Sequence, residues 1–319
     1  MRPARWVLVV VVLGALVAGL VGRCLRPQRP ATNYAPRIYV ADWSNHRVVR
    51  LDDMRGRNWM ALGEGRLHFP VGVGADAAGR IYVSEQDRRI VRVDDRSGAG
   101  WTAYTPKGAE GKPNKCMGSW TFVDQAGHIY FTYDGNHRVV RLDDMNGTNR
   151  TAFGTEGSGA GQFRYPAGIW VDAAGRIYVA DFDNFRIVRM DDMNGANWTT
   201  FGRYGSGPGE FINPCGIWGD SQGRIYVADQ GNDRVVRIDD MAGTNWTAVG
   251  SFGTEPTPGK LYAPCGVCVD RIGRIYVSES SSNNRIVRMD DMSGANWTVF
   301  GTGGNGAGEF AAPMGIFVR

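Results

Sequence analysis

The chain has 319 residues and a formal net charge of +4 at neutral pH. Residues 1–30 contain five arginines and no acidic residue, which leaves 31 basic and 32 acidic side chains in the rest of the chain. A nearly neutral domain argues against a nucleic-acid partner, because such a partner needs a basic surface.

A stretch of residues without a charge covers 6–22 and follows Arg2 and Arg5. Its seventeen mostly apolar residues are at the short end for a membrane-spanning helix and slightly long for the core of a secretory signal. No small-residue cleavage motif follows directly, and Arg23 stands where a bacterial lipoprotein signal needs a small residue. We therefore predict a hydrophobic helix within residues 1–30, acting as a membrane anchor or a signal segment. A short tether at 31–36 then leads to a domain outside the cytoplasm, membrane-anchored or secreted.

A phrase related to R-I-Y-V-A-D occurs six times along the chain. Its central isoleucines are separated by 43, 48, 48, 48 and 50 residues. A period near fifty with strand-like units indicates a solenoid or a propeller. The isoleucines are Ile38, Ile81, Ile129, Ile177, Ile225 and Ile275.

The repeat at residues 165–202 shows the unit most clearly. Apolar runs at 166–172, 177–181, 187–190 and 197–202 suit strands, and turn-forming Asp, Asn and Gly residues separate them. No helical period is found in the unit. Four short antiparallel strands in each repeat predict an all-β fold with one propeller blade per repeat.

The two ends of the repeat region complete each other. Residues 37–63 supply the second, third and fourth strands of a blade, whereas residues 312–319 supply only a first strand. Pairing these two segments closes a six-bladed ring over residues 37–319 and leaves no long free sheet edge.

Two kinds of segment resemble the NHL-repeat family. The sequences A-D-W-S-N-H-R-V at 41–48 and Y-D-G-N-H-R-V at 133–139 are similar to its signature, as are the G-x-G-x-F-x-x-P-x-G-I segments at 159–169 and 207–217. The resemblance covers about residues 36–319 and implies a six-bladed propeller. It implies several functions, because NHL propellers include protein-binding and RNA-binding domains, extracellular receptor modules and a few lyases or hydrolases.

The loop after the second strand of each repeat has one position where the side chain varies on a constant frame. Such variation indicates a recognition surface, although drift of an exposed loop would look the same. The linker before the third blade adds Lys112 and Lys115, which suit an anionic or peptide partner or are simply solvated. The residues at the variable position are His46, Arg88, His137, Phe185, Asp233 and Asn284.

Acidic residues end the second strand in five repeats, with Tyr133 at the equivalent place in the third. Six-bladed lactonases of the regucalcin type hold a divalent cation with acidic and amide side chains at the channel, and a ring of acids resembles that arrangement. Alternatively, each acid accepts hydrogen bonds from the backbone of its own loop. We expect this structural role, with no cofactor, no metal and no catalytic residue. The acids are Asp42, Glu85, Asp181, Asp229 and Glu279.

Two cysteines, Cys215 and Cys265, occupy the same repeat position, directly after the proline that opens the first strand. They come from neighbouring blades and form either a disulfide or a pair of buried thiols at the channel. A disulfide needs Cα atoms within about 7 Å, a distance that the sequence does not give. We expect two buried thiols, because the other repeats fill this position with Val71, Ser119, Ala167 and Met314, and the disulfide stays the alternative.

The nearly uniform repeats concentrate polar groups at no single place, as catalysis would require. We therefore expect a non-catalytic binding or scaffold propeller, monomeric, that engages a protein, peptide or glycan through its loop face. The competing hypothesis is a metal-assisted hydrolase or lyase with its site at the channel mouth and the acid ring as ligands.

Overall fold

The computed structural model describes residues 36–87, 89–94, 99–106 and 120–319. The helical elements in these ranges are three short 3-10 turns, η1 (Asp134–Asn136), η2 (Phe182–Asn184) and η3 (Gln230–Asn232). None of the helices in these ranges is long and apolar enough to cross a membrane. The hydrophobic helix expected at 6–22 lies outside the described residues, as does most of the tether.

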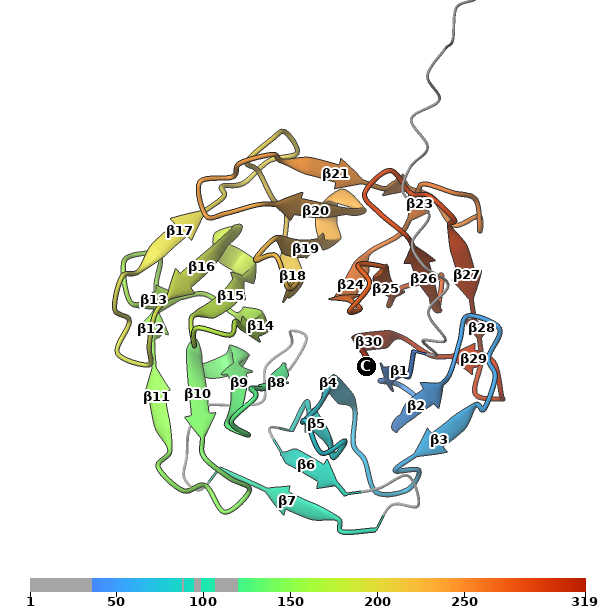
Figure 1. Cartoon of the computed structure of the whole chain (residues 1–319), viewed down its shortest axis with the longest axis horizontal. Helices are drawn as coiled ribbons and strands as arrows, with labels where there is room; N and C mark the ends of the chain where they lie inside the picture. Colours follow the sequence, from blue (N-terminus) through green and yellow to red (C-terminus); the bar gives the residue numbers. More distant parts are fainter. Residues whose placement is uncertain (1–35, 88, 95–98, 107–119) are drawn as a thin grey trace, which may run out of the picture. The chain divides into compact units, whose positions relative to one another are not determined.

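The described residues form six four-stranded antiparallel sheets around a central axis, and each sheet is one blade of a propeller (Figure 1). The first strand of each blade lies nearest the axis and the fourth lies at the rim. β-branched and aromatic residues suit strands that are covered on both sides, and all five residues of the I-Y-V-A-D strand at Ile177–Asp181 are buried. The all-β, six-bladed fold predicted from the repeats is confirmed.

The four strands of each blade follow one another from the axis outward. Blade 1 contains β30 (Pro313–Val318), β1 (Ile38–Asp42), β2 (Arg47–Leu51) and β3 (Met60–Leu62); blade 2 contains β4 (Pro70–Ala75), β5 (Ile81–Glu85), β6 (Ile90–Val93) and β7 (Thr102–Tyr104). Blade 3 contains β8 (Thr121–Val123), β9 (Ile129–Tyr133), β10 (Arg138–Leu142) and β11 (Thr151–Phe153); blade 4 contains β14 (Pro166–Val171), β15 (Ile177–Asp181), β16 (Arg186–Met190) and β17 (Thr199–Phe201). Blade 5 contains β18 (Pro214–Gly219), β19 (Ile225–Asp229), β20 (Arg234–Ile238) and β21 (Thr247–Val249); blade 6 contains β24 (Pro264–Val269), β25 (Ile275–Glu279), β26 (Arg285–Met289) and β27 (Thr298–Phe300).

Blade 1 is built from both ends of the repeat region. Strand β30 pairs antiparallel with β1, and Val318, Phe317 and Ile316 lie opposite the first three residues of β1. Two backbone hydrogen bonds of 3.0 Å join Arg37 and Arg319 beyond the last strand pair. The predicted closure of the ring through its terminal strands is therefore present.

A glycine at the third position of the first strand lets adjacent blades meet near the axis. A Cβ atom added to Gly168 would lie 2.5 Å from the carbonyl oxygen of Cys215, and one added to Gly216 would lie 2.6 Å from that of Cys265. A side chain has no room at these distances, so glycine is the residue that permits this approach. The repeated P-x-G pattern therefore follows from the packing of inner strands.

Three linkers between blades form parallel two-stranded ladders. The strand pairs are β12 (Thr155–Glu156) with β13 (Gln162–Phe163), β22 (Ser251–Phe252) with β23 (Lys260–Leu261), and β28 (Thr302–Gly303) with β29 (Glu309–Phe310). The buried ring of Phe163 packs against Trp198 of blade 4 with centroids 5.1 Å apart. These linkers thus connect neighbouring blades near the rim.

The fourth strand of blade 4 is shorter than the predicted 197–202. It covers Thr199–Phe201, because Asn197 and Gly202 have positive φ angles of 52° and 113°. Such backbone angles belong to turns and are incompatible with an extended strand.

Candidate functional site

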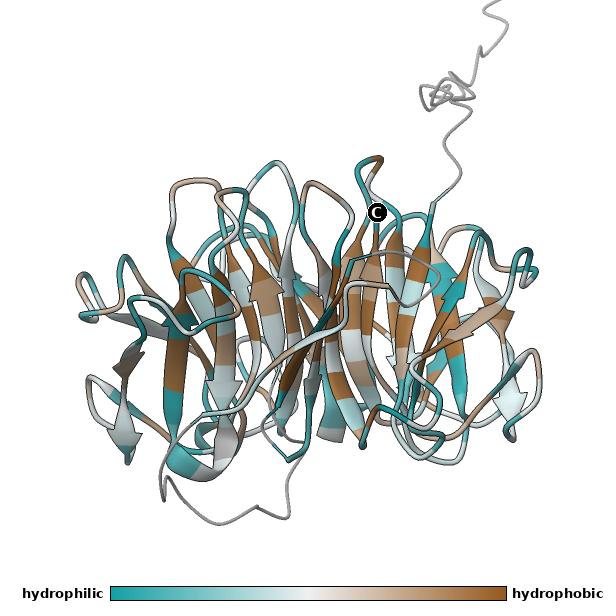
Figure 2. Cartoon of the chain, turned by 90° about the horizontal axis from the view of Figure 1, so that it is seen from below, coloured by the Kyte–Doolittle hydropathy of each residue, from teal (hydrophilic) through white to brown (hydrophobic). Residues whose placement is uncertain are grey.

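The connections of each blade define two faces of the propeller. The loop face carries the loops between second and third strands and the linkers that enter each blade. The turn face carries the hairpin turns between first and second strands, such as residues 172–176. Figure 2 shows loops on both sides of the strands, whose hydrophobic residues lie between them.

The repeated acids lie at the loop face, and each is fully buried. Asp181 accepts hydrogen bonds from the backbone amide of Arg164 at 2.7 Å, from Nδ2 of Asn184 at 2.8 Å and from Nε of Arg186 at 2.8 Å. The amide belongs to the linker, 17 residues before the acid, and not to the acid's own loop. The same three kinds of donor bind Asp42, Asp229 and Glu279, and Glu85 binds a linker amide and an arginine.

The arginine that binds each acid also holds the linker. Arg186 donates from Nη1 to the carbonyl oxygen of Ser158 at 2.6 Å and from Nη2 to that of Gln162 at 2.9 Å. Burial raises the pKa of Asp181, and the hydrogen bonds from Arg164, Asn184 and Arg186 oppose that rise. Each acid is therefore part of a linker-to-blade joint. No group of three or more His, Cys, Asp or Glu residues is placed to hold a metal in the part of the chain that the structure describes.

The variable loop position has a left-handed backbone, with φ between 44° and 56° at its five described residues. Nδ1 of His137 accepts a hydrogen bond from the amide of Tyr165 at 3.1 Å, and Oδ1 of Asp233 accepts one from Ala263 at 2.8 Å. His46 and Asn284 make the equivalent bond to Phe69 and Ala312, while the ring of Phe185 packs edge-on against Tyr204. Four of these side chains thus bind the residue that precedes the first strand of the next blade. Arg88, Lys112 and Lys115 lie outside the described residues, and the recognition surface stays a prediction.

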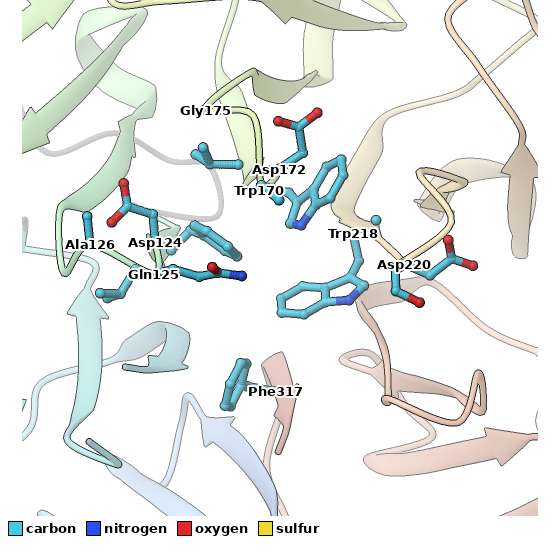
Figure 3. A pocket seen from close by; sticks show the side chains of 15 residues that line it. Asp124, Gln125, Ala126, Trp170, Asp172, Gly175, Trp218, Asp220 and Phe317 are labelled. Atoms are coloured by element: carbon cyan, nitrogen blue, oxygen red, sulfur yellow. The ribbon is translucent and has the colours of Figure 1, made fainter. Parts of the chain in front are cut away.

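One position of the first strand is aromatic in four blades; it is the second residue of the three-residue β8 and the fifth residue of the six-residue first strands of the other blades. These residues are Phe122, Trp170, Trp218 and Phe317, while Gly74 and Cys268 hold the position in the other two blades. The four rings gather around the axis at the turn face and line a pocket of about 470 Å³ (Figure 3). Because they belong to blades 1, 3, 4 and 5, only the closed ring brings them together.

Contacts between the rings hold them in place. Trp218 packs edge-on against Phe122 at 5.9 Å and against Phe317 at 5.8 Å between centroids. Trp170 packs on Tyr178 at 4.7 Å and covers the α-carbon of Gly219, where an added Cβ would lie 2.1 Å from Cη2 of the indole. Blades 1, 3, 4 and 6 have valine at the position of Gly219. Gly219 is therefore the local change that makes room for Trp170.

The rim of the pocket carries acids that already bind a side chain of their own blade. Oδ2 of Asp172 accepts from Nε of Arg176 at 2.6 Å, and Oδ2 of Asp220 accepts from Nε of Arg224 at 2.6 Å. Asp124 contacts Nδ1 of His128 at 2.8 Å. Gln125 and Ser221 add uncharged polar groups, and Figure 3 shows the Gln125 amide directed between the aromatic rings. The pocket therefore offers ring surfaces with a few hydrogen-bonding groups.

The surface predicted from the sequence lies on the loop face, and that prediction does not include the aromatic residues. Their signal is nevertheless present in the sequence: one position of the first strands holds Phe, Trp, Gly or Cys, and four of the six residues there are aromatic. The aromatic residues fall into register when the six first strands are aligned by the aspartate that follows each of them, or by Arg319 in blade 1.

Cys215 and Cys265 lie side by side on β18 and β24. Their Sγ atoms are 3.0 Å apart, and both residues are fully buried. Both are free thiols in this structure.

Comparisons with known proteins agree with this architecture. The NHL repeat family model matches residues 163–190. No curated protein matches the chain in sequence.

Three solved structures illustrate the likeness in fold. A chain of a nidogen/laminin complex is 17% identical with a TM-score of 0.64, and the match covers 89% of this chain and 98% of that one. A protein of unknown function from Bacteroides caccae is 15% identical with a TM-score of 0.61, covering 89% and 99%. Virginiamycin B lyase from Staphylococcus aureus is 19% identical with a TM-score of 0.54, covering 77% and 73%. At such identities the likeness shows the fold alone, and the chain is a six-bladed β-propeller that contains an NHL repeat.

Proposed function

We propose that the protein is a non-catalytic binding propeller, membrane-anchored or exported, whose partner protein inserts an uncharged ring-bearing side chain into the aromatic pocket. The observation that carries this proposal is the convergence of four aromatic residues from four blades at one pocket of about 470 Å³. Binding pockets are typically apolar and aromatic with a few placed polar groups.

The chemistry of the pocket favours an uncharged occupant. The carboxylates of Asp124, Asp172 and Asp220 already bind His128, Arg176 and Arg224, so a cation would find no unpaired acid there. An anion would face the same carboxylates at short range. A ring, in contrast, gains edge-to-face contacts with Trp218 and Phe317 and buries apolar area on several sides.

A protein partner is supported by two considerations. Aromatic residues dominate the sites that contribute most to protein–protein binding, because they bury a large area with few rotatable bonds. The nidogen/laminin structure with the same fold is a complex between proteins. A glycan needs many acceptors and donors, and most of the rim acceptors here are occupied by arginine and backbone groups.

Catalysis finds less support in this arrangement. The titratable side chains that line the pocket are three aspartates, each held by a cationic or imidazole partner. A general base or nucleophile has to be available to its substrate. The lyases with the same fold keep a metal-assisted hydrolase or lyase as the competing function.

The test is a selection of phage-displayed peptides on the immobilised full chain, followed by calorimetry with the selected peptides. We expect peptides that contain Trp, Tyr or Phe, and binding at least about tenfold weaker to Trp218→Ala, which corresponds to about 1.4 kcal/mol. The matched control is Phe252→Ala, because Phe252 is an exposed aromatic residue, 62% accessible, in the linker that enters blade 6.

Three outcomes would contradict the proposal. Peptides that lack a ring, or that bind Trp218→Ala and the native protein equally, would exclude the pocket. Loss of binding only in a variant with His46, His137 and Phe185 changed to alanine would move the site to the loop face. About one equivalent of calcium or zinc per purified chain, measured by elemental mass spectrometry without chelator, would favour the metal-assisted enzyme.

A further inference from the structure

Cys215 and Cys265 are the second residues of the inner strands of blades 5 and 6. They are separated by 50 residues in sequence, yet their Sγ atoms lie 3.0 Å apart. Both side chains are completely buried, and Sδ of Met314 lies 3.8 Å from Sγ of Cys265. Elsewhere in the described ring this position holds Val71, Ala167 and Met314, so no second such pair of thiols occurs at this level of it.

The inner strands that carry the two cysteines approach each other closely. A Cβ added to the next residue, Gly216, would lie 2.6 Å from the carbonyl oxygen of Cys265 and 3.1 Å from Cα of Gly266. Disulfides join residues whose Cα atoms are about 4.4–6.8 Å apart. The glycines that let the inner strands meet thus also bring the two cysteines together, and their Sγ atoms are 3.0 Å apart.

We propose that Cys215 and Cys265 form a disulfide in the working protein, which cross-links the inner strands of blades 5 and 6. The oxidant is a disulfide, either of a thiol oxidoreductase or of a small molecule such as glutathione disulfide. One cysteine thiolate attacks a sulfur of that disulfide and releases one thiol, and the second cysteine then attacks the mixed disulfide and releases the other. Two protein thiols are thereby oxidised, and the added disulfide is reduced to two thiols.

The bond has to form before the ring closes. In the folded protein the thiols are out of reach of any reagent, and burial together with the neighbouring Cys265 raises the pKa of the Cys215 thiol well above its ordinary value. Exchange requires the thiolate, so folded, reduced protein exchanges extremely slowly. The same burial protects the bond, once it has formed, from reductants that do not unfold the chain.

The cross-link has consequences for the compartment in which the protein works and for the aromatic pocket. Structural disulfides persist in oxidising compartments, so the bond agrees with a propeller outside the cytoplasm. Strand β18 carries both Cys215 and Trp218, so the bond fixes the strand that supplies one wall of the aromatic pocket. The proposal does not depend on the proposed binding function, since it concerns the thiols alone.

The test is to fold the full chain from denaturant in a mixture of reduced and oxidised glutathione. The product is then denatured in N-ethylmaleimide, digested without reduction and mapped by mass spectrometry. We expect the peptides of Cys215 and Cys265 to be recovered as one linked pair, two hydrogens lighter than the sum of the free peptides. Cys268, which is also buried but is not paired with another cysteine in the described residues, should carry the maleimide and serves as the internal control.

Recovery of Cys215 and Cys265 as two separately alkylated peptides, both in this sample and in chain isolated from an oxidising compartment, would overturn the proposal. A second measurement distinguishes a bond from mere packing of two thiols. The denaturant midpoint of native protein should fall after reduction in the unfolded state and refolding with reductant, and that of Cys268→Ser should fall equally. Cys215→Ser should show no difference between the two conditions; if it does not fold, Cys215→Ala replaces it. Equal midpoints of oxidised and reduced native protein would count against the bond.

Discussion

On the loop face, five of the six repeats use their polar side chains to bind their own linkers. On the turn face, one position of the first strand differs between blades, and its aromatic side chains meet at a pocket. The acid, asparagine and arginine of blade 4 hold the linker between residues 157 and 164, and blades 1 and 5 repeat the arrangement almost atom for atom. The aromatic position of the first strand instead reads Gly, Phe, Trp, Trp, Cys and Phe around the ring. Contacts that recur from blade to blade therefore mark the residues that hold the propeller together. A position that differs between blades near the axis marks where a ligand would be recognised.

The largest effect should follow from breaking the ring itself. Removal of residues 314–319 deletes most of β30, leaves the edge of β1 unpaired and removes Phe317 from the pocket. We expect loss of cooperative unfolding and aggregation, because an exposed edge strand associates with other chains. Circular dichroism during thermal unfolding and size-exclusion chromatography measure both effects. Arg319→Ala keeps the strand and should unfold cooperatively, so similar behaviour of the two variants would contradict the role of β30.

The next largest effect concerns the buried acids that hold the linkers at the loop face. Asp181→Ala leaves the Arg186 guanidinium, 12% accessible, without its carboxylate and frees the amide of Arg164. Removing one partner of a buried ion pair costs about 3–5 kcal/mol. In the control, Asp192→Ala, the lost bonds lie in an exposed turn where water replaces them, so the loss of stability should be much smaller. Denaturant unfolding of both variants measures the difference; equal losses would show that the acid ring is dispensable for the fold.

A smaller effect should come from the turn-face pocket. Gly219→Val restores the valine that four other blades carry, but its side chain would overlap the indole of Trp170. Overpacking of this kind costs about 1–3 kcal/mol, and a displaced indole would narrow the pocket. The double variant Trp170→Phe with Gly219→Val should recover the stability, because Phe occupies the equivalent position in blades 1 and 3. If the double variant is no more stable than Gly219→Val, the two residues are not coupled.

Most of the fold could be predicted from the sequence because the period, the turn residues and the two incomplete ends each constrain it. The closure of β30 on β1 and the second strand at 177–181 agree with the predicted positions. The aromatic pocket was harder to predict, because it depends on which side chains of different blades come into contact around the axis. Trp170 and Gly219 are 49 positions apart, and only the packed ring shows that one makes room for the other. The role of His137 was hidden for a similar reason, since its partner Tyr165 belongs to the next blade.

The smallest effect is a pH dependence at this joint between blades 3 and 4. His137 is buried, and burial lowers its pKa below the ordinary value near 6.5. The charge of Arg164 lowers this pKa further, whereas the charges of Glu156 and Asp183 raise it in part. The unfolded chain therefore binds a proton at a pH where the folded protein does not, so the contribution of His137 to stability is present above pH 6.5 and is lost as the pH falls below it. His137→Asn keeps an acceptor for the amide of Tyr165, as Asn284 does for Ala312 at 2.7 Å, but cannot titrate. Denaturant midpoints measured from pH 7.5 to 5 should converge between the two proteins as the pH falls, because native protein loses stability more steeply. Parallel midpoints over this range would show that His137 keeps the same affinity for protons in both states, and that its hydrogen bond to Tyr165 does not depend on the neutral ring.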